Sequence, residues 1–154
     1  MLTSAQLALF ERLIDVGKLL EKRADRATKR EVGLKYSQYE VLIRLRNAGG
    51  ELRMSELGGL LVTSPSGLTY HLSQLEKAGL AERFTAADDE RGVVARITPQ
   101  GRSLLVDAFD AQTDMITDAV VAPLDESTIE DLTRELGRLQ VHLRGEATGG
   151  ALPY

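Results

Sequence analysis

Residues 63–80, which read TSPSGLTYHLSQLEKAGL, restrict the fold most because they mark both ends of a helix. Ser64 suits the N-cap position, where a hydroxyl accepts a hydrogen bond from a free backbone N–H. Pro65 suits the first helical position, and Gly79 suits the residue just past the end. The stretch therefore predicts one short helix with defined ends.

This predicted helix has an apolar and a polar face. Three leucines recur at the spacing of one helix face and predict burial: Leu68, Leu72 and Leu75. The opposite face carries hydrogen-bonding groups and few charges: Ser66, Tyr70, Ser73, Gln74 and Lys77. Solvent alone explains a polar outer face, so the neighbouring segments decide its interpretation.

The neighbouring segments predict a winged helix-turn-helix. Ser37 stands three residues before Glu40, a capping-box spacing that starts a helix ending at Gly49. ELRM then predicts a single strand, and Ser55 caps a very short helix, ELGGLL. After the helix of residues 63–80, AERFT and VVARI predict a hairpin around the loop AADDERG, residues 86–92. The expected fold is mainly α with a small β-hairpin wing.

This order of elements suits DNA. A helix fits the major groove of B-form DNA, where its side chains reach base edges and its free N–H groups favour phosphate oxygens. The hairpin lies alongside and reaches the backbone or the minor groove. At the loop tip, Arg91 extends away from the body of the protein. Asp89, two residues earlier, is placed to pair with it and restrict its rotamers.

Residues 55–102 resemble the multiple-antibiotic-resistance regulator (MarR) family. In that family a stretch like LEKAGL closes the recognition helix, DERG corresponds to a wing motif of an aspartate and an arginine one residue apart, and ITPQG leads into a long helix. The resemblance implies a homodimeric transcriptional regulator, commonly a repressor, on a palindromic operator in double-stranded DNA. It implies these DNA-binding residues, with Asp89 supporting the wing: Ser64, Ser66, Thr69, Tyr70, Gln74 and Arg91.

The resemblance also implies two lobes. Residues 1–34 and 99–145 form the helical dimerisation lobe, residues 35–98 form the DNA-binding lobe, and residues 146–154 are expected to be a disordered tail. Small aromatic or anionic effectors commonly bind between the lobes in this family, which would place Tyr36 and Tyr39 near that crevice. Packing in the core is the other interpretation of these tyrosines.

Long amphipathic helices flank the winged module. Residues 5–31 and two helices after Thr98, one up to Pro123 and one beyond it, repeat apolar side chains at helical spacing. The candidate dimer contacts are Leu7, Phe10, Leu132, Leu136 and Leu139. Packing within one chain is the alternative, but this many apolar helix faces beside one small module favour a partner surface.

The charge distribution leaves a second function open. Residues 50–98 carry five bases and seven acids, a net charge of −2, whereas residues 18–46 carry nine bases and four acids, a net charge of +5. Tyr70 and Pro65 stand where family members often have basic residues. The basic segment can supply phosphate contacts or merely a solvated face. The net negative charge of residues 50–98 is also consistent with a second function, that of a dimeric winged-helix module that binds protein and no longer reads DNA.

Other classes of function are disfavoured. The absence of cysteine removes disulfides, thiolate metal sites and thiol switches. His71 and His142 are far apart in sequence and have no metal-ligand companions, so we expect no enzyme, no metal and no cofactor. No apolar run is long enough to span a bilayer and no secretion signal precedes the first helix, so we expect the cytoplasm and no membrane partner.

Overall fold

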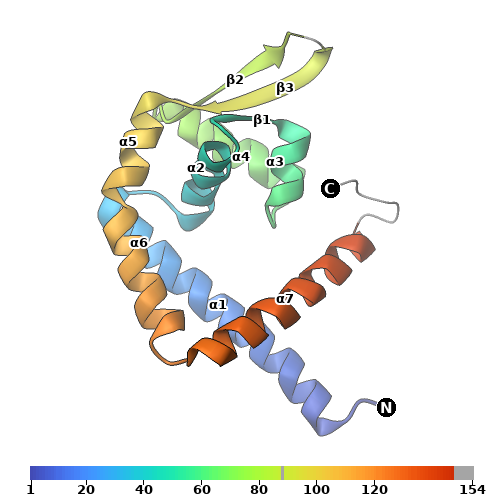
Figure 1. Cartoon of the computed structure of the whole chain (residues 1–154). Coiled ribbons are helices and arrows are strands. Elements are labelled where there is room, and N and C mark those ends of the chain that lie inside the picture. Colours follow the sequence, from blue (N-terminus) through green and yellow to red (C-terminus); the bar gives the residue numbers. More distant parts are fainter. Residues whose placement is uncertain (88, 148–154) are drawn as a thin grey trace. The chain divides into compact units, whose positions relative to one another are not determined.

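The computed structural model describes the backbone of residues 1–87 and 89–147 and the side chains of residues 1–87 and 92–145. Two compact units, Met1–Met115 and Ile116–Tyr154, make up the chain. The first unit contains α1 (Ser4–Val32), α2 (Tyr36–Asn47), β1 (Glu51–Arg53), α3 (Met54–Leu60), α4 (Pro65–Lys77), β2 (Ala81–Ala86), β3 (Asp89–Ile97), α5 (Pro99–Asp107) and most of α6 (Phe109–Ile116) (Figure 1). Within the described residues, no helix is both long enough and apolar enough to cross a membrane.

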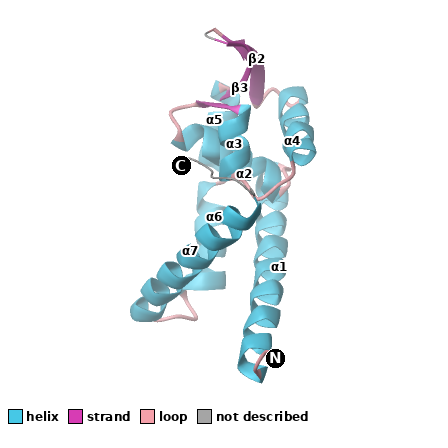
Figure 2. Cartoon of the chain, turned by 90° about the vertical axis from the view of Figure 1, so that its right-hand side faces the viewer, coloured by secondary structure: helices cyan, strands magenta, loops and turns pink. Residues whose placement is uncertain are grey.

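A small antiparallel sheet completes the winged fold that the sequence predicts. Its strand order is β1-β3-β2, so the single strand predicted at ELRM becomes an outer strand beside the hairpin. Arg53 lies opposite Val94, and Arg83 lies opposite Ala95. The hairpin of β2 and β3 extends beyond the helices of the module (Figure 2). The predicted order of short helix, turn, capped helix and hairpin is therefore confirmed.

The core of the first unit lies between α2, α3, α4, the sheet and α5. The stripe of α4 predicted from the sequence is buried, with Leu72 and Leu75 fully enclosed and Leu68 only 2% exposed. Leucines of the neighbouring helices, including Leu42 and Leu57, pack in the same cluster. These contacts fix the rotation of α4 about its own axis, and the rotation decides which side chains face outward.

Two predicted helix starts are wrong by one or more residues. Ser37 does not cap α2, because the Lys35 N–H donates to Gln38 Oε1 (3.0 Å) and the Tyr36 N–H donates to Asp25 Oδ1 of α1 (2.9 Å). The N-cap is therefore Lys35, two residues before the predicted Ser37. Ser55 likewise lies inside α3, whose start is set by the Arg53 N–H donating to Glu56 Oε2 (2.9 Å).

The loop of the hairpin is shorter than the predicted residues 86–92. β2 continues to Ala86, which pairs with Asp89 at the start of β3 after a register shift that follows Thr85. The backbone of Arg91 therefore belongs to β3 and not to a loop. Strand pairing resumes beyond the register shift, at Ala86 and Asp89, and this pairing outweighs the polar composition from which a loop was predicted.

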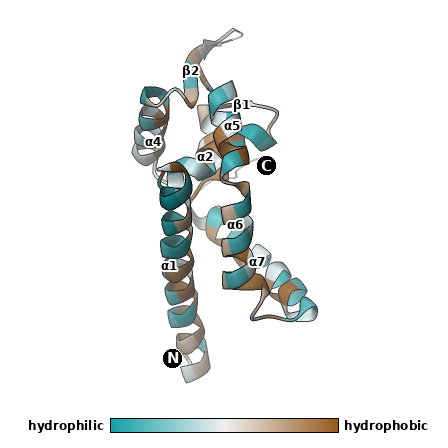
Figure 3. Ribbon diagram, turned by 90° about the vertical axis from the view of Figure 1, so that its left-hand side faces the viewer, coloured by the Kyte–Doolittle hydropathy of each residue, from teal (hydrophilic) through white to brown (hydrophobic). Residues whose placement is uncertain are grey.

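The N-terminal half of α1 leaves a row of apolar side chains exposed. Burial in this helix is confined to its other half, at Ala24, Ala27 and Thr28. The exposed apolar residues of α1 are Leu7, Leu9, Phe10, Ile14, Val16 and Leu19. Apolar and polar positions alternate along the helix (Figure 3). The amphipathic helix predicted over residues 5–31 is confirmed, and its apolar stripe is only partly covered.

The helix predicted from Thr98 to Pro123 is interrupted. α5 ends at Asp107 and α6 begins at Phe109, and a π-helical turn, η1 (Thr117–Val121), follows. Thr98 caps α5 by accepting a hydrogen bond from the Gly101 N–H (3.1 Å).

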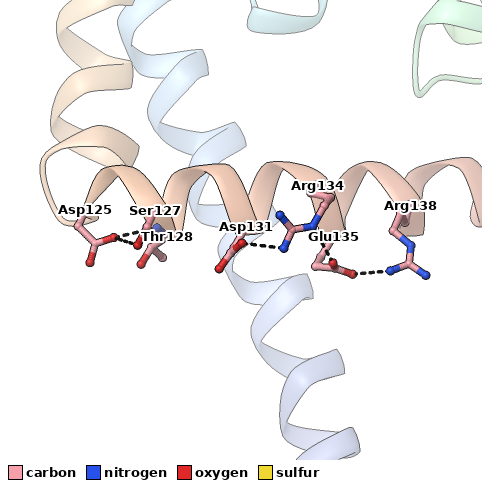
Figure 4. A network of polar contacts seen from close by, with 7 residues as sticks. All are labelled: Asp125, Ser127, Thr128, Asp131, Arg134, Glu135 and Arg138. Carbon is pink, nitrogen blue, oxygen red and sulfur yellow. Dashed lines mark hydrogen bonds and ion pairs between the residues drawn. The ribbon is translucent and has the colours of Figure 1, made fainter.

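In the second unit, α7 (Glu126–Ala147) begins after Asp125, whose Oδ1 accepts from the Thr128 N–H (2.8 Å) and from Ser127 Oγ (2.9 Å) (Figure 4). One face of α7 exposes Leu132, Leu136, Leu139 and Leu143. The tail predicted to begin at residue 146 is shortened, because residues 146 and 147 are helical. Residues 148–154 lie outside the described residues.

Candidate nucleic-acid interface

The start of α4 is built as the sequence predicts. Ser64 Oγ accepts from the Gly67 N–H (3.1 Å), and Pro65 occupies the first turn. A Cβ at Gly67 would lie 2.6 Å from Thr63 Oγ1 and 3.1 Å from Ser64 Oγ. Both hydroxyls, including the one that caps α4, would have to move to admit a side chain there.

The outward face of α4 carries two side chains with uncommitted polar groups. Ser66, Thr69 and Tyr70 are exposed, Tyr70 by 55%. The Thr69 hydroxyl donates to the Pro65 carbonyl oxygen (3.0 Å), which leaves it less free to donate elsewhere. Gln74 is half-buried. Among the described residues, the side chains of Tyr70 and Gln74 form no hydrogen bond, so their donors and acceptors can meet an external partner.

An arginine that the sequence analysis did not single out links α4 to the wing. Arg83 on β2 donates from Nε to Glu76 Oε1 (3.0 Å), and from Nη2 to Glu76 Oε2 (2.6 Å) and to Ser73 Oγ (3.1 Å). These hydrogen bonds lower the pKa of the Glu76 carboxyl and raise the pKa of Arg83. The bidentate pair fixes the hairpin against α4.

The predicted wing contacts fall at the edge of the described structure. Asp89 and Arg91 have their backbone in β3, but their side chains lie outside the described residues. On the same hairpin, Arg96 lies over the Phe84 ring (4.3 Å to its centroid) and pairs with Glu51 (2.8 Å) and Glu82 (3.5 Å). This cluster joins all three strands and holds the base of the wing.

The two tyrosines proposed for an effector differ in position. Tyr39 is only 4% exposed and belongs to the core, whereas Tyr36 lines a cavity of about 370 Å³ between α1, the start of α2 and α4. Their rings are 6.4 Å apart, and burial raises the pKa of both phenols. The charged residues that line the cavity are Lys18, Glu21, Lys22, Asp25 and Lys35, and His71 closes one side.

His71 lies between this cavity and Tyr70 on the outward face of α4. Burial, and secondly the positive charge of Lys35, lower the pKa of His71. Its buried Nδ1 has no hydrogen-bond partner within the described residues, and its ring meets the Tyr70 ring edge-on at 5.7 Å. No group of metal-ligating side chains occurs in the described part of the chain.

Comparisons with known proteins agree with this geometry. The sequence model of the MarR family matches residues 34–93. The transcriptional regulator MhqR of Bacillus subtilis (strain 168) is 28% identical over 112 residues, covering 73% of this chain and 76% of that protein. FarR of Neisseria gonorrhoeae, another regulator of the helix-turn-helix type, is 29% identical over 102 residues, covering 64% and 69%.

Solved structures are similar over nearly the whole chain. Sco3205, a MarR family transcriptional regulator from Streptomyces coelicolor solved in complex with DNA, superposes with a TM-score of 0.86 at 26% identity, covering 91% of this chain and 88% of that one. AbsC, a MarR family regulator from the same organism, superposes with a TM-score of 0.85 at 25% identity, covering 94% and 98%.

Proposed function

We propose that the chain is a transcriptional regulator of the MarR family, whose sequence model matches residues 34–93, and that it acts as a repressor. It binds an inverted-repeat operator as a homodimer and leaves the operator when a small ligand binds. The observation that carries this proposal is the outward face of α4, where Tyr70 and Gln74 are held in fixed register by the buried leucines behind them. The sequence relatives named above are regulators, which supports a binding function over a catalytic one.

We assign the contacts with DNA bases to α4. A glutamine side chain can donate and accept at once and so pairs with the major-groove edge of adenine, while a tyrosine offers a hydroxyl and an aromatic ring. Ser64, Ser66 and Thr69 lie near the start of the helix and serve backbone contacts more readily than base contacts, because their hydroxyls already bond within the turn.

The wing is the second contact. Arg91 is proposed to enter or flank the minor groove, where negative potential is concentrated, and Asp89 to orient its guanidinium. Support comes from the hairpin, whose β3 strand brings the backbone of both residues to the end farthest from its base. The ion-paired cluster around Arg96 stiffens that base.

Dimerisation is supported by exposed apolar helix faces in both units. Leu7 and Phe10 on α1 and Leu132, Leu136 and Leu139 on α7 are each more than a third exposed in the single chain. Contiguous apolar faces of this kind mark a partner surface. A two-fold dimer presents two copies of α4, which matches an operator of two inverted half-sites.

The ligand is proposed to be a small aromatic anion, bound in the cavity beside Tyr36. Lys18, Lys22 and Lys35 outnumber the two acids that line the cavity, which favours a negative charge, and the ring of Tyr36 offers an aromatic surface. His71 lines the same cavity and lies on α4, so an occupant there contacts the recognition helix directly.

Selection of bound sequences from a random DNA pool tests the proposal. An inverted repeat, with half-sites about one helical turn apart, is the expected result. The acidic charge of residues 50–98 supports one competing function, a dimeric module that binds protein and not DNA. Titration with mixed genomic DNA at low salt separates the two, because a repressor binds with strong salt dependence and the interaction module does not bind.

A further inference from the structure

His71 brings a titratable group of α4 to the cavity beside Tyr36. This cavity of about 370 Å³ has the size of a small-molecule site, and all the residues that line it belong to the first compact unit. We propose that the cavity binds an aromatic carboxylate together with one proton, which His71 takes up from solvent. The inference rests on the proposed function, in which this cavity binds a small aromatic anion, and it adds the kind of anion and the proton.

The imidazole of His71 lacks a polar partner in the protein. Its buried Nδ1 forms no hydrogen bond within the residues that the structure describes. A neutral imidazole has one donor and one acceptor nitrogen, whereas both nitrogens of an imidazolium are donors. A carboxylate oxygen beside the ring would supply the acceptor that the imidazolium needs, and a hydrogen bond between two ionised groups is stronger than one between neutral groups.

The groups around His71 supply no counter-charge for such a proton. The charged and titratable side chains that face it are Lys18, Glu21, Lys22 and Asp25 on α1, Lys35 and Tyr36 at the start of α2, and Tyr70 beside it on α4. Burial and then the charge of Lys35 lower the pKa of His71, and neither acid offsets them. Asp25 is also committed, since its Oδ1 accepts from the Tyr36 N–H. His71 is therefore mostly neutral at about pH 7 in the free protein.

An anion in the cavity reverses this preference. A negative charge in contact with a titrating group shifts its pKa by about 1–3 units, and here it raises the pKa of His71. Binding then takes up a proton wherever His71 is neutral in the free protein, and affinity falls as the pH rises through the pKa of the complex. A carboxylate suits this coupling because it stays ionised over that range, whereas a phenol is neutral there.

The proton also affects the proposed base contact. The ring of Tyr70 lies 5.7 Å from the ring of His71, centroid to centroid. A cation within about 6 Å of an aromatic ring attracts it, so the imidazolium holds Tyr70 more strongly against α4, in competition with a DNA base. Because such coupling is reciprocal, operator binding in turn favours release of the proton and the carboxylate.

Calorimetric titration with benzoate tests the proposal. Binding is measured between about pH 5.5 and 8, in two buffers of different ionisation enthalpy, so that the protons taken up are counted. Wild type is expected to bind benzoate about tenfold or more weakly at the upper end of this range and to show net proton uptake between the two limits. Benzamide, a neutral molecule of nearly the same shape, is expected to bind with one affinity throughout and without proton uptake.

Variants assign the proton to one side chain. His71→Gln keeps a hydrogen-bonding group but takes up no proton, so its benzoate affinity should not depend on pH, and benzamide binding shows that it is folded. His142→Gln removes the other of the two histidines, on α7, and should keep the wild-type pH dependence. Lys35→Gln keeps His71 and removes the charge that lowers its pKa, so the fall in affinity should move to higher pH. Displacement of operator DNA by benzoate should be stronger at low pH in wild type and independent of pH in His71→Gln.

The proposal is overturned if benzoate does not bind, if its affinity for wild type is the same at every pH, or if His71→Gln keeps the wild-type pH dependence. None of these results bears on whether the protein selects an operator from random DNA. Failure of wild type to bind DNA would instead overturn the proposed function and leave the proton uptake to be judged by calorimetry alone.

Discussion

The proposed dimer can be tested most directly at Leu136 on α7. This residue is 46% exposed in the single chain. Full burial of a leucine side chain contributes about 1.5–3 kcal/mol, so covering the exposed half in a dimer contributes about 1 kcal/mol per protomer. Two-fold symmetry doubles this, and Leu136→Ala should therefore weaken the dimer by about 2 kcal/mol, or roughly 30-fold in Kd. Leu136→Asp also buries a carboxylate and should abolish the dimer at micromolar concentration.

Sedimentation equilibrium over a range of protein concentrations measures the dimer constant of each variant. The same helix supplies the control. Asp131, Arg134, Glu135 and Arg138 form a chain of ion pairs along α7 (Figure 4). Arg138 is 77% exposed and lies on the helix face away from Leu136, so Arg138→Ala should leave the dimer constant unchanged. A soluble Leu136→Asp variant that is fully dimeric and still binds operator would refute the assignment.

Three further predictions concern base recognition by Gln74, DNA contact by the wing and the stability of the fold. Gln74→Ala should cost about 1–3 kcal/mol on the selected operator and little on random DNA, measured by fluorescence anisotropy; equal losses on both would make Gln74 a backbone contact. Arg91→Ala should reduce affinity and lower the salt slope by about one with the Tm almost unchanged, whereas Asp89→Ala should reduce affinity but keep the slope; an unchanged slope in Arg91→Ala would make the wing a solvated turn. Gly101→Ala should lower unfolding stability by about 1–3 kcal/mol in denaturant titrations, because its Cβ would overlap the Leu80 carbonyl oxygen; unchanged stability would contradict that packing.

The parts of the fold that were predictable depend on local chemistry. Ser64 and Thr98 cap the helices that follow them, because each hydroxyl reaches an N–H three residues ahead whatever the rest of the chain does. The start of α2 was mispredicted for the opposite reason. Asp25, on a different helix, accepts the Tyr36 N–H, and no pattern near Ser37 contains that information.

In the candidate site, too, the features fixed by local geometry could be predicted from the sequence, and those fixed by tertiary geometry could not. Tyr70 and Gln74 could be assigned outward from the leucine spacing alone, since helix geometry fixes their phase. The pair between Glu76 and Arg83 could not, because it depends on the angle at which β2 leaves α4 after Gly79. The two residues stand only seven positions apart, so the charges were visible, but a salt bridge across a turn requires the tertiary geometry.

The charge distribution indicates how such a module would discriminate among DNA sequences. Non-specific affinity depends on how many phosphates are neutralised, and a reading module with a net charge of −2 offers little general attraction. Its cations would therefore have to act at fixed places, and Arg83 is one cation that is held in place, by its ion pair with Glu76. Contacts from arginines held in fixed positions are lost when the DNA backbone does not have the shape of the operator. A diffuse electrostatic attraction between protein and DNA survives such a change. If the proposed function holds, an acidic module with a few fixed arginines would gain specificity by binding random DNA weakly, and the basic residues in 18–46 would be the remaining source of general attraction.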